Sequence, residues 1–122
     1  WDELNIVTPG ANFGWPTVEG ISEDPRFVDP VFVWESAEAA PSGIAVTNTA
    51  IYMTATRGER LWQVPLGNED MRQMLVDEYG RLQAVVAEGD DALWVLTSNL
   101  DGGTPAVDDD LLLLIEMRPI TP

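Results

Sequence analysis

Short apolar segments recur along most of this chain, and turn-forming residues separate them. From residue 31 onward, candidate strands begin mostly every 7 to 13 residues, with Gly, Asn and Asp between them. This spacing is typical of antiparallel all-β folds such as sandwiches, barrels and propellers. The predicted strands cover residues 31–34, 43–47, 50–55, 60–66, 73–77, 82–87, 92–97 and 111–117.

Two other segments depart from this pattern. Residues 68–78 also carry the spacing of an amphipathic helical turn, through Met71, Met74 and Leu75, so a short helix is the alternative to a strand there. Gly and Pro interrupt residues 1–30 so often that we expect a long structured loop.

Two parts of the chain look like successive copies of one unit. Each copy has a strand, a tight turn, a strand that bears an aromatic residue, and a further strand after a loop. Ala50 and Ala92 occupy matching places 42 residues apart, a separation in the range of propeller blades. Two blades cannot close a ring, so we expect part of a larger structure. Its open edge strands would attract other chains and would also allow a homodimer.

The charge of the chain excludes several classes of partner and chemistry. There are 21 acidic residues against six Arg, no Lys, His or Cys, and a net charge of −15. Nucleic acids and anionic membrane surfaces bind clustered positive charge, which this chain lacks. A membrane span requires ~18 apolar residues in a row, and no apolar run in the sequence approaches that length. Without His and Cys, these residues can form no zinc finger, no Ser-His-Asp or Cys-His triad and no disulfide.

The basic residues are concentrated in the middle of the chain. Residues 42–81 hold Arg57, Arg60, Arg72 and Arg81 together with five acids, whereas each flanking part has a net charge of −7. An anionic ligand would therefore bind near this middle segment. The alternative is that these Arg side chains pair with neighbouring acids on a solvated surface.

The first residues have the composition of a calcium loop. The acids Asp2 and Glu3 precede a Gly-rich turn, and Glu19 and Glu23 follow it. Such a chain can fold back around a hard cation, because Ca²⁺ takes six to eight oxygen ligands from carboxylates, carbonyls and water. The alternative is an acidic loop that hydrogen-bonds to its own backbone.

The order of motifs along the chain closely resembles the C-terminal part of the soluble quinoprotein glucose/sorbosone (aldose sugar) dehydrogenases. The resemblance runs from Asp2 to about Met117 and depends on the order and spacing of several motifs. These are Asp2-Glu3-Leu4-Asn5, residues 10–16 (GANFGWP), Ala40-Pro41-Ser42-Gly43, Arg57-Gly58, Gly80-Arg81 and residues 92–97 (ALWVLT).

This resemblance implies a fold and a function. The chain would be the C-terminal fragment of a six-bladed β-propeller with antiparallel four-stranded sheets. Residues 1–30 would form a metal-loop segment, 31–79 a blade and 80–122 the last blade. The parent protein would be periplasmic or extracellular and would oxidise aldose sugars with pyrroloquinoline quinone (PQQ) and Ca²⁺. The family's general base is a His upstream of this stretch, so we expect no catalytic residue here and no activity of the fragment alone.

The resemblance also assigns site residues. Arg57 and Arg81 would bind the carboxylates of the quinone, Trp34 would line the cofactor pocket, and Asp2 would face the active site. Calcium would be held by the carboxylates of Glu3 and Glu23 and by the main-chain carbonyls of Phe13 and Glu19.

The sequence departs from the family after Arg81. Where relatives have a second Arg followed by Asp, this chain has Gln83 and Ala84, which removes one positive charge from the expected pocket. A cofactor-free propeller binding module and a metal-dependent lactonase-like propeller therefore stay open as alternatives. We also expect Trp62 and Trp94 to be core aromatics, and residues 101–110 to form a solvated hairpin.

Overall fold

Residues 1–67 and 70–117 are described by a computed structural model, and in these residues the chain forms strands and no helix. The predicted all-β class is confirmed. No helix in this described part could cross a membrane. Residues 5–31 contain turns and bends without strands, as the loop prediction requires.

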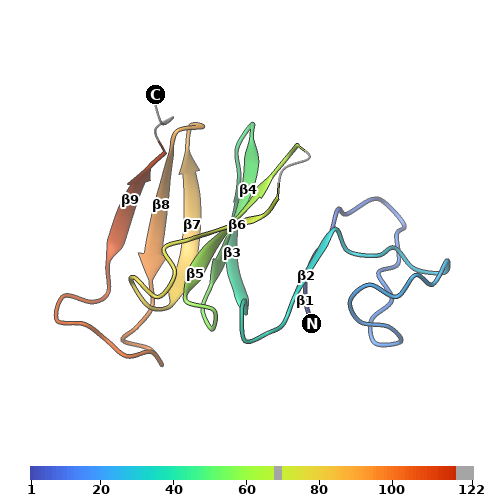
Figure 1. Ribbon diagram of the computed structural model, residues 1–122, viewed down its shortest axis with the longest axis horizontal. Helices are drawn as coiled ribbons and strands as arrows, with labels where there is room; N and C mark the ends of the chain where they lie inside the picture. The colour runs from blue at the N-terminus through green and yellow to red at the C-terminus, as the bar shows by residue number, and fades with distance from the viewer. Residues whose placement is uncertain (68–69, 118–122) are drawn as a thin grey trace.

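The strands form three antiparallel sheets that lie side by side as layers (Figure 1). A two-stranded ribbon leads into a four-stranded sheet, and a three-stranded sheet lies on the other side of the four-stranded one. The ribbon is β1 (Asp2–Leu4) and β2 (Phe32–Trp34); the four-stranded sheet is β3 (Pro41–Val46), β4 (Ala50–Ala55), β5 (Arg60–Pro65) and β6 (Arg72–Met74); the three-stranded sheet is β7 (Leu82–Glu88), β8 (Ala92–Thr97) and β9 (Leu112–Glu116).

Three details differ from the sequence-based expectation. The sheet of β7, β8 and β9, which corresponds to the second copy of the repeat, has three strands within the described residues instead of the expected four. β2 pairs with β1, which was not predicted, and does not join the following sheet. In the described part of segment 68–78, β6 is a strand because Gln73 pairs with Trp62, and Leu75 then takes a positive φ of 55° that ends it.

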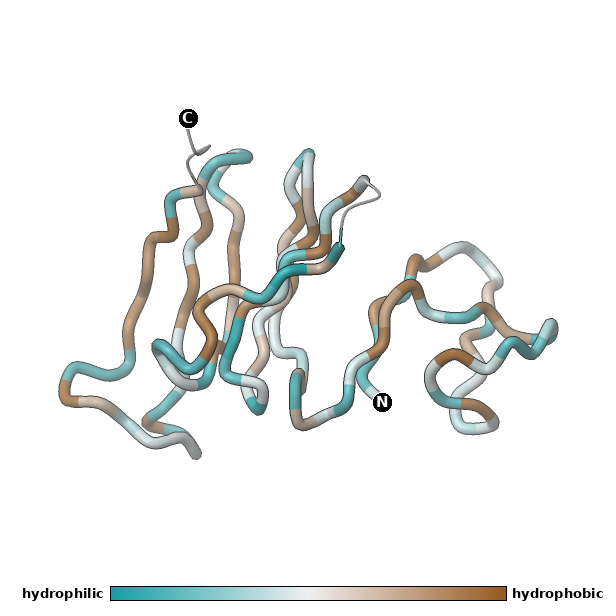
Figure 2. Tube along the Cα trace, viewed as in Figure 1, coloured by the Kyte–Doolittle hydropathy of each residue, from teal (hydrophilic) through white to brown (hydrophobic). Residues whose placement is uncertain are grey.

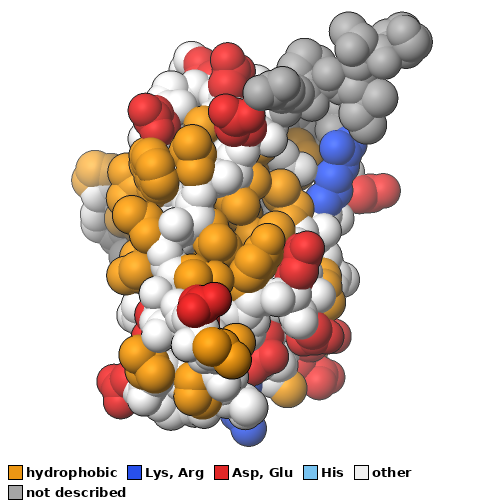
Figure 3. Space-filling model, turned by 90° about the vertical axis from the view of Figure 1, so that its left-hand side faces the viewer, with side chains coloured by type: hydrophobic (Ala, Val, Ile, Leu, Met, Phe, Trp, Pro, Cys, Tyr) orange, Lys and Arg blue, Asp and Glu red, His pale blue; other side chains and the backbone are white. Residues whose placement is uncertain are grey.

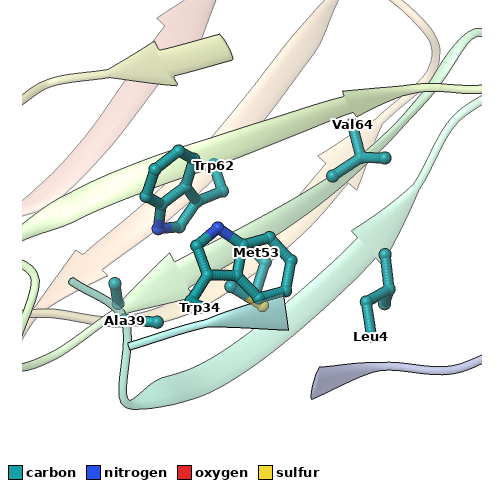
Figure 4. Close-up of a cluster of buried hydrophobic side chains, with 7 residues drawn as sticks. Leu4, Trp34, Ala39, Met53, Trp62 and Val64 are labelled. Atoms are coloured by element: carbon teal, nitrogen blue, oxygen red, sulfur yellow. The ribbon is translucent and has the colours of Figure 1, made fainter. Parts of the chain in front are cut away.

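The first core lies between the ribbon and the four-stranded sheet. The indole rings of Trp34 and Trp62 pack against one another at a tilt of 49° with centroids 5.7 Å apart, and Met53 lies beside them (Figure 4). Trp62 is 4% exposed, as predicted for a core aromatic. Figure 2 shows that hydrophobic residues follow the strands, whereas hydrophilic residues gather at their ends.

The second core lies between the four-stranded and the three-stranded sheets, where Tyr52, Leu61 and Leu93 are almost completely buried. The strand β8 alternates between this core and the opposite face of its sheet. On that opposite face, Trp94 pairs with Val86 and Leu114 on the neighbouring strands and remains 36% exposed. Figure 3 views the molecule from this side and shows apolar side chains across the face. The prediction that Trp94 is a core residue is therefore wrong within this chain.

Candidate functional site

The four-stranded and three-stranded sheets border a pocket of about 390 Å³. The pocket lies where β4 ends and β7 begins, so it receives Arg57 from the turn after β4 and Arg81 from the segment before β7. The structure thus brings together two cations that are 24 positions apart in the sequence. The lining residues are Thr56, Arg57, Glu59, Arg81, Gly102, Gly103 and Thr104.

Arg57 is presented by a turn whose backbone is fixed on both sides of it. The backbone N–H and the hydroxyl of Thr56 both donate to the carbonyl of Ala40, at 3.1 and 3.0 Å. A side chain at Gly58 would collide with the carbonyl group of Glu38, so only glycine fits directly after Arg57. The tight packing against Glu38 therefore explains why a glycine follows Arg57 in this motif. The Arg57 side chain itself is exposed.

Arg81 is held by the loop that follows β8. Its backbone N–H donates to Oδ1 of Asn99 at 2.9 Å, and its Nη1 donates to the carbonyl of Asp101 at 2.9 Å. The carbonyl of Arg81 accepts the N–H of Ser98 at 2.9 Å. Both the backbone and the guanidinium of Arg81 are therefore positioned by this loop.

Neither pocket arginine forms an ion pair within residues 1–67 and 70–117. Ion pairs in this part of the chain join the amino group of Trp1 to Glu19 and Arg26 to Asp24. For Arg57 and Arg81, the expectation of pairing with neighbouring acids is therefore not met. Arg57 and Arg81 bring two positive charges to the pocket and Glu59 brings one negative charge, so the lining has a net positive charge in a chain that is strongly acidic overall.

Gln83 lies at an irregularity of β7, where the register with β8 shifts between Leu82 and Ala84. The Gln83 side chain is exposed and does not line the pocket. Ala84 lies at a close approach of the two sheets, because a Cβ built on Gly43 would be 3.0 Å from the Ala84 Cα.

Asp2 is bound to the segment that carries Arg57. Its Oδ2 accepts the N–H of Ala40 at 2.8 Å, and the carbonyl of Ala40 accepts the two hydrogen bonds from Thr56. Asp2 therefore supports the turn of Arg57 through Ala40, although it does not line the pocket of the two arginines.

Trp34 lies in the first core and not at the pocket. It is 2% exposed and packs against Trp62 (Figure 4). The ring of Phe32 also lies beside it, with centroids 6.2 Å apart. Its indole N–H is buried and has no hydrogen-bond partner among the described residues.

The predicted metal ligands are only partly brought together. Glu3, Phe13 and Glu19 line a second pocket of about 320 Å³, whereas Glu23 does not. The carboxylate of Glu3 accepts the N–H of Gly20 at 2.6 Å and the side-chain amide of Asn5 at 3.1 Å. No group of three or more acids able to hold a metal ion occurs among the described residues.

One observation in this region is compatible with a cation. The Oδ1 atom of Asn5 is buried and accepts no hydrogen bond from the described residues, although its own amide group contacts Glu3. Amide and carboxylate oxygens are ligands that Ca²⁺ accepts, but two side chains do not complete its shell of six to eight oxygens. The fit to calcium is therefore incomplete.

The sequence analysis missed part of the site. Residues 101–103 were expected in a solvated hairpin, but Gly102 and Gly103 line the pocket and contact Arg81. Asn99 was not singled out, although it is 3% exposed and binds the Arg81 backbone. The adjacent glycines were the available indication, because paired glycines permit a close approach of chain segments.

Comparisons with known proteins agree with this architecture. A sequence model described as Glucose / Sorbosone dehydrogenase matches residues 1–112. The PQQ-bound form of an aldose sugar dehydrogenase from Streptomyces coelicolor is 46% identical with a TM-score of 0.90, over 95% of this chain and 36% of that one. A putative oxidoreductase (glucose dehydrogenase) from Thermus thermophilus is 35% identical with a TM-score of 0.80, over 93% of this chain and 36% of that one. An uncharacterized protein of Synechocystis is 37% identical over 59 residues, 38% of this chain and 14% of that protein.

The chain thus spans about a third of the length of the solved structures it matches. These matches, together with the antiparallel sheets, establish the fold as part of a β-propeller.

Proposed function

The chain belongs to the glucose/sorbosone dehydrogenase family, and on that premise we propose that it is the C-terminal part of a PQQ-dependent enzyme that oxidises aldose sugars. The observation that carries this proposal is that Arg57 and Arg81 line one pocket and that neither has an acidic ion-pair partner among the described residues. PQQ is a tricarboxylate, and guanidinium groups form strong, bidentate hydrogen bonds with carboxylates.

In this proposal, the segment binds and orients the cofactor. Arg57 and Arg81 would hold carboxylates of the quinone from two sides, and the glycines at 102 and 103 would keep that side of the pocket open. When bound, the quinone accepts the hydride that the sugar loses. The family resemblance places the general base, a His, upstream of this segment, and the 122 residues themselves contain no His.

The partner of this segment is the rest of the propeller. Tyr52 and Trp94 are 42 residues apart and occupy matching places on the second strand of each repeat. Tyr52 is 1% exposed because the three-stranded sheet covers it, whereas Trp94 is 36% exposed. A further sheet of the same ring would cover Trp94 in the same way.

Calcium and export are further parts of the proposal. Calcium would bind near Glu3 and the unpaired Asn5 oxygen, together with oxygens from elsewhere in the parent protein. In thermal melts of the full-length protein, Ca²⁺ should raise the Tm of the wild type more than that of Glu3→Gln. Equal shifts would reject this site.

The protein would act in the periplasm or outside the cell, where related quinoproteins work.

A titration of the full-length protein with PQQ tests the main proposal. Arg57→Ala and Arg81→Ala should each weaken binding by about 10- to 100-fold, because a hydrogen bond between charged groups contributes about 1.5–3 kcal/mol. Arg26→Ala is the matched control, since Arg26 is an exposed arginine that pairs with Asp24 outside the pocket. Gln83 is exposed and lies outside this pocket, so Gln83→Arg should change binding less than either alanine variant.

Each outcome of this titration favours one interpretation. Normal binding that neither arginine variant alters would reject the assignment of the pocket. Absence of any PQQ binding would favour a cofactor-free binding module, the alternative that Gln83 and Ala84 keep open. Metal-dependent lactone hydrolysis by the full-length protein would favour the lactonase-like alternative.

A further inference from the structure

We propose that the loop of residues 99–103 is a positioning element for the guanidinium of Arg81, with Asn99 as its anchor and Gly102 as the position that sets where the guanidinium lies. This inference rests on the proposed function, because it concerns the same pocket. It assigns a role to residues that sequence motifs did not single out.

Asn99 anchors the loop from the inside of the molecule. It is 3% exposed, so its hydrogen bonds must come from the protein. Its Oδ1 accepts the N–H of Arg81 at 2.9 Å, and its Nδ2 donates to the carbonyl of Tyr79 at 2.8 Å. One side chain thus fixes the backbone immediately before β7, from which Arg81 extends.

Asp110 fixes Asn99 in turn. Its Oδ1 accepts the backbone N–H of Asn99 at 2.6 Å and the hydroxyl of Thr97 at 3.0 Å. The start of the loop is therefore hydrogen-bonded both to the segment before β7 and to the segment that leads into β9.

Gly102 then leaves the space that the guanidinium occupies. A Cβ built on Gly102 would lie 2.5 Å from Nη1 of Arg81, and one built on Gly103 would lie 3.1 Å from its Cδ. Gly102 also has a φ of +98°, which other residues rarely adopt. Any side chain at position 102 would therefore displace the Arg81 guanidinium from its place beside the loop.

The loop fixes the guanidinium without neutralising it. Nη1 of Arg81 donates to the carbonyl of Asp101, and no carboxylate of the described residues pairs with Arg81. A guanidinium has five N–H donors, so donors remain for an anion in the pocket. Because its orientation is already set, Arg81 loses little conformational entropy when a carboxylate binds.

A double-mutant cycle in the full-length protein tests this role with PQQ as the probe. Gly102→Ala should weaken PQQ binding at least 10-fold in the wild-type background and less than 2-fold in the Arg81→Ala background, because its effect passes through Arg81. Gly89→Ala is the matched control. Gly89 also has a positive φ, at 62°, but a Cβ there would meet no atom within 4 Å. It should change PQQ binding less than 2-fold in both backgrounds.

The outcomes separate this inference from the proposed function. If Arg81→Ala weakens binding but Gly102→Ala does not, or if the two losses add, the positioning role is wrong while the proposed function stands. If Arg81→Ala leaves PQQ binding unchanged, the proposed function loses its pocket.

A second measurement requires no PQQ, and its first comparison uses the wild type alone. In nitrogen-15 NMR relaxation of the full-length protein, the Nε–H group of Arg81 should be ordered on the ps–ns timescale, and that of the exposed Arg57 should be mobile. Gly102→Ala should make Arg81 mobile, whereas Gly89→Ala should not. Equal mobility of Arg81 and Arg57 in the wild type would overturn the inference.

Discussion

Ser42 and Gly43 lie at a close approach of the inner strands of the two sheets. The hydroxyl of Ser42 donates to the carbonyl of Leu82 at 2.8 Å and so joins β3 to β7. A Cβ on Gly43 would lie 3.0 Å from the Ala84 Cα and 3.2 Å from the Val85 nitrogen, both of which are backbone atoms. The Ala-Pro-Ser-Gly motif therefore has a structural function, which is to hold two sheets together beside the pocket.

This contact predicts a cost for any side chain at position 43. Gly43→Ala should lower the free energy of unfolding of the full-length protein by about 1–3 kcal/mol, because backbone atoms must move apart. Gly67→Ala is the control, since a Cβ there meets no atom within 4 Å. Urea unfolding measures both, and an equal change in the two variants would contradict the close approach.

Asp110 makes the loop beside Arg81 sensitive to acid. The backbone N–H of Asn99 is the main cause that holds the pKa of Asp110 below its ordinary value of 3.8, and the charge of Arg81 also lowers it. A carboxyl whose pKa is lower in the folded state stabilises the fold above its unfolded pKa of about 3.9. That stability is lost as the pH falls through the folded pKa.

Unfolding free energies measured below about pH 4 should therefore decrease more steeply with falling pH for the wild type than for Asp110→Asn. Asp108→Asn is the control, since the Asp108 side chain is exposed and the described contacts include no hydrogen bond to it. If Asp110→Asn follows the wild-type slope, the carboxylate does not stabilise the loop.

At the scale of residues, the sequence indicated the two charged residues of the site but not the residues that hold them in place. Arg57 and Arg81 were assigned because the family resemblance places cofactor-binding cations at these two positions. Asn99 could not be found, because Asn is common in turns and its partners lie 18 to 20 positions away. Trp34 was placed at the pocket although it packs in the first core, since the sequence does not show which face of β2 is covered.

At the scale of elements, strands with regular alternation were predicted within a few residues. β8 alternates between buried and exposed positions, as its sequence indicates. β1 was missed because it has three residues, two of them acidic, and forms only through pairing with β2 thirty residues later. Segment 68–78 was ambiguous for a related reason, since pairing with β5 decides that β6 is a strand.

The β9 strand predicts how the isolated chain behaves. It is the outer strand of its sheet in the described residues, and its apolar sequence has no Lys or Pro to block pairing with another chain. Leu114 is 45% exposed and belongs to the apolar face around Trp94 (Figure 3). We therefore expect the 122-residue chain to self-associate.

Sedimentation velocity measures this association. Leu114→Lys should shift the isolated chain toward monomer, because the new charge would have to be buried at the contact. Val107→Lys, which adds the same charge on a fully exposed loop residue, should leave the association unchanged. A wild-type chain that is monomeric, or two variants that behave alike, would contradict the role of this face.

At the scale of the whole molecule, the 42-residue repeat predicted the stacked sheets, but the repeat alone could not show what covers each end. The buried Tyr52 and the exposed Trp94 show that the two copies are equivalent in sequence and differ in their neighbours. The pocket likewise depends on the stacking, because Arg57 and Arg81 come from different sheets of the repeat. No single motif could reveal that these two residues line the same pocket.

The central claim is that the two arginines bind the carboxylates of the quinone. A crystal structure of the full-length protein with PQQ tests it most directly. We predict that carboxylate oxygens of the quinone lie within hydrogen-bonding distance of both Arg57 and Arg81, with Gly102 and Gly103 beside them. A structure with PQQ bound elsewhere, and with both guanidinium groups in solvent, would contradict the claim.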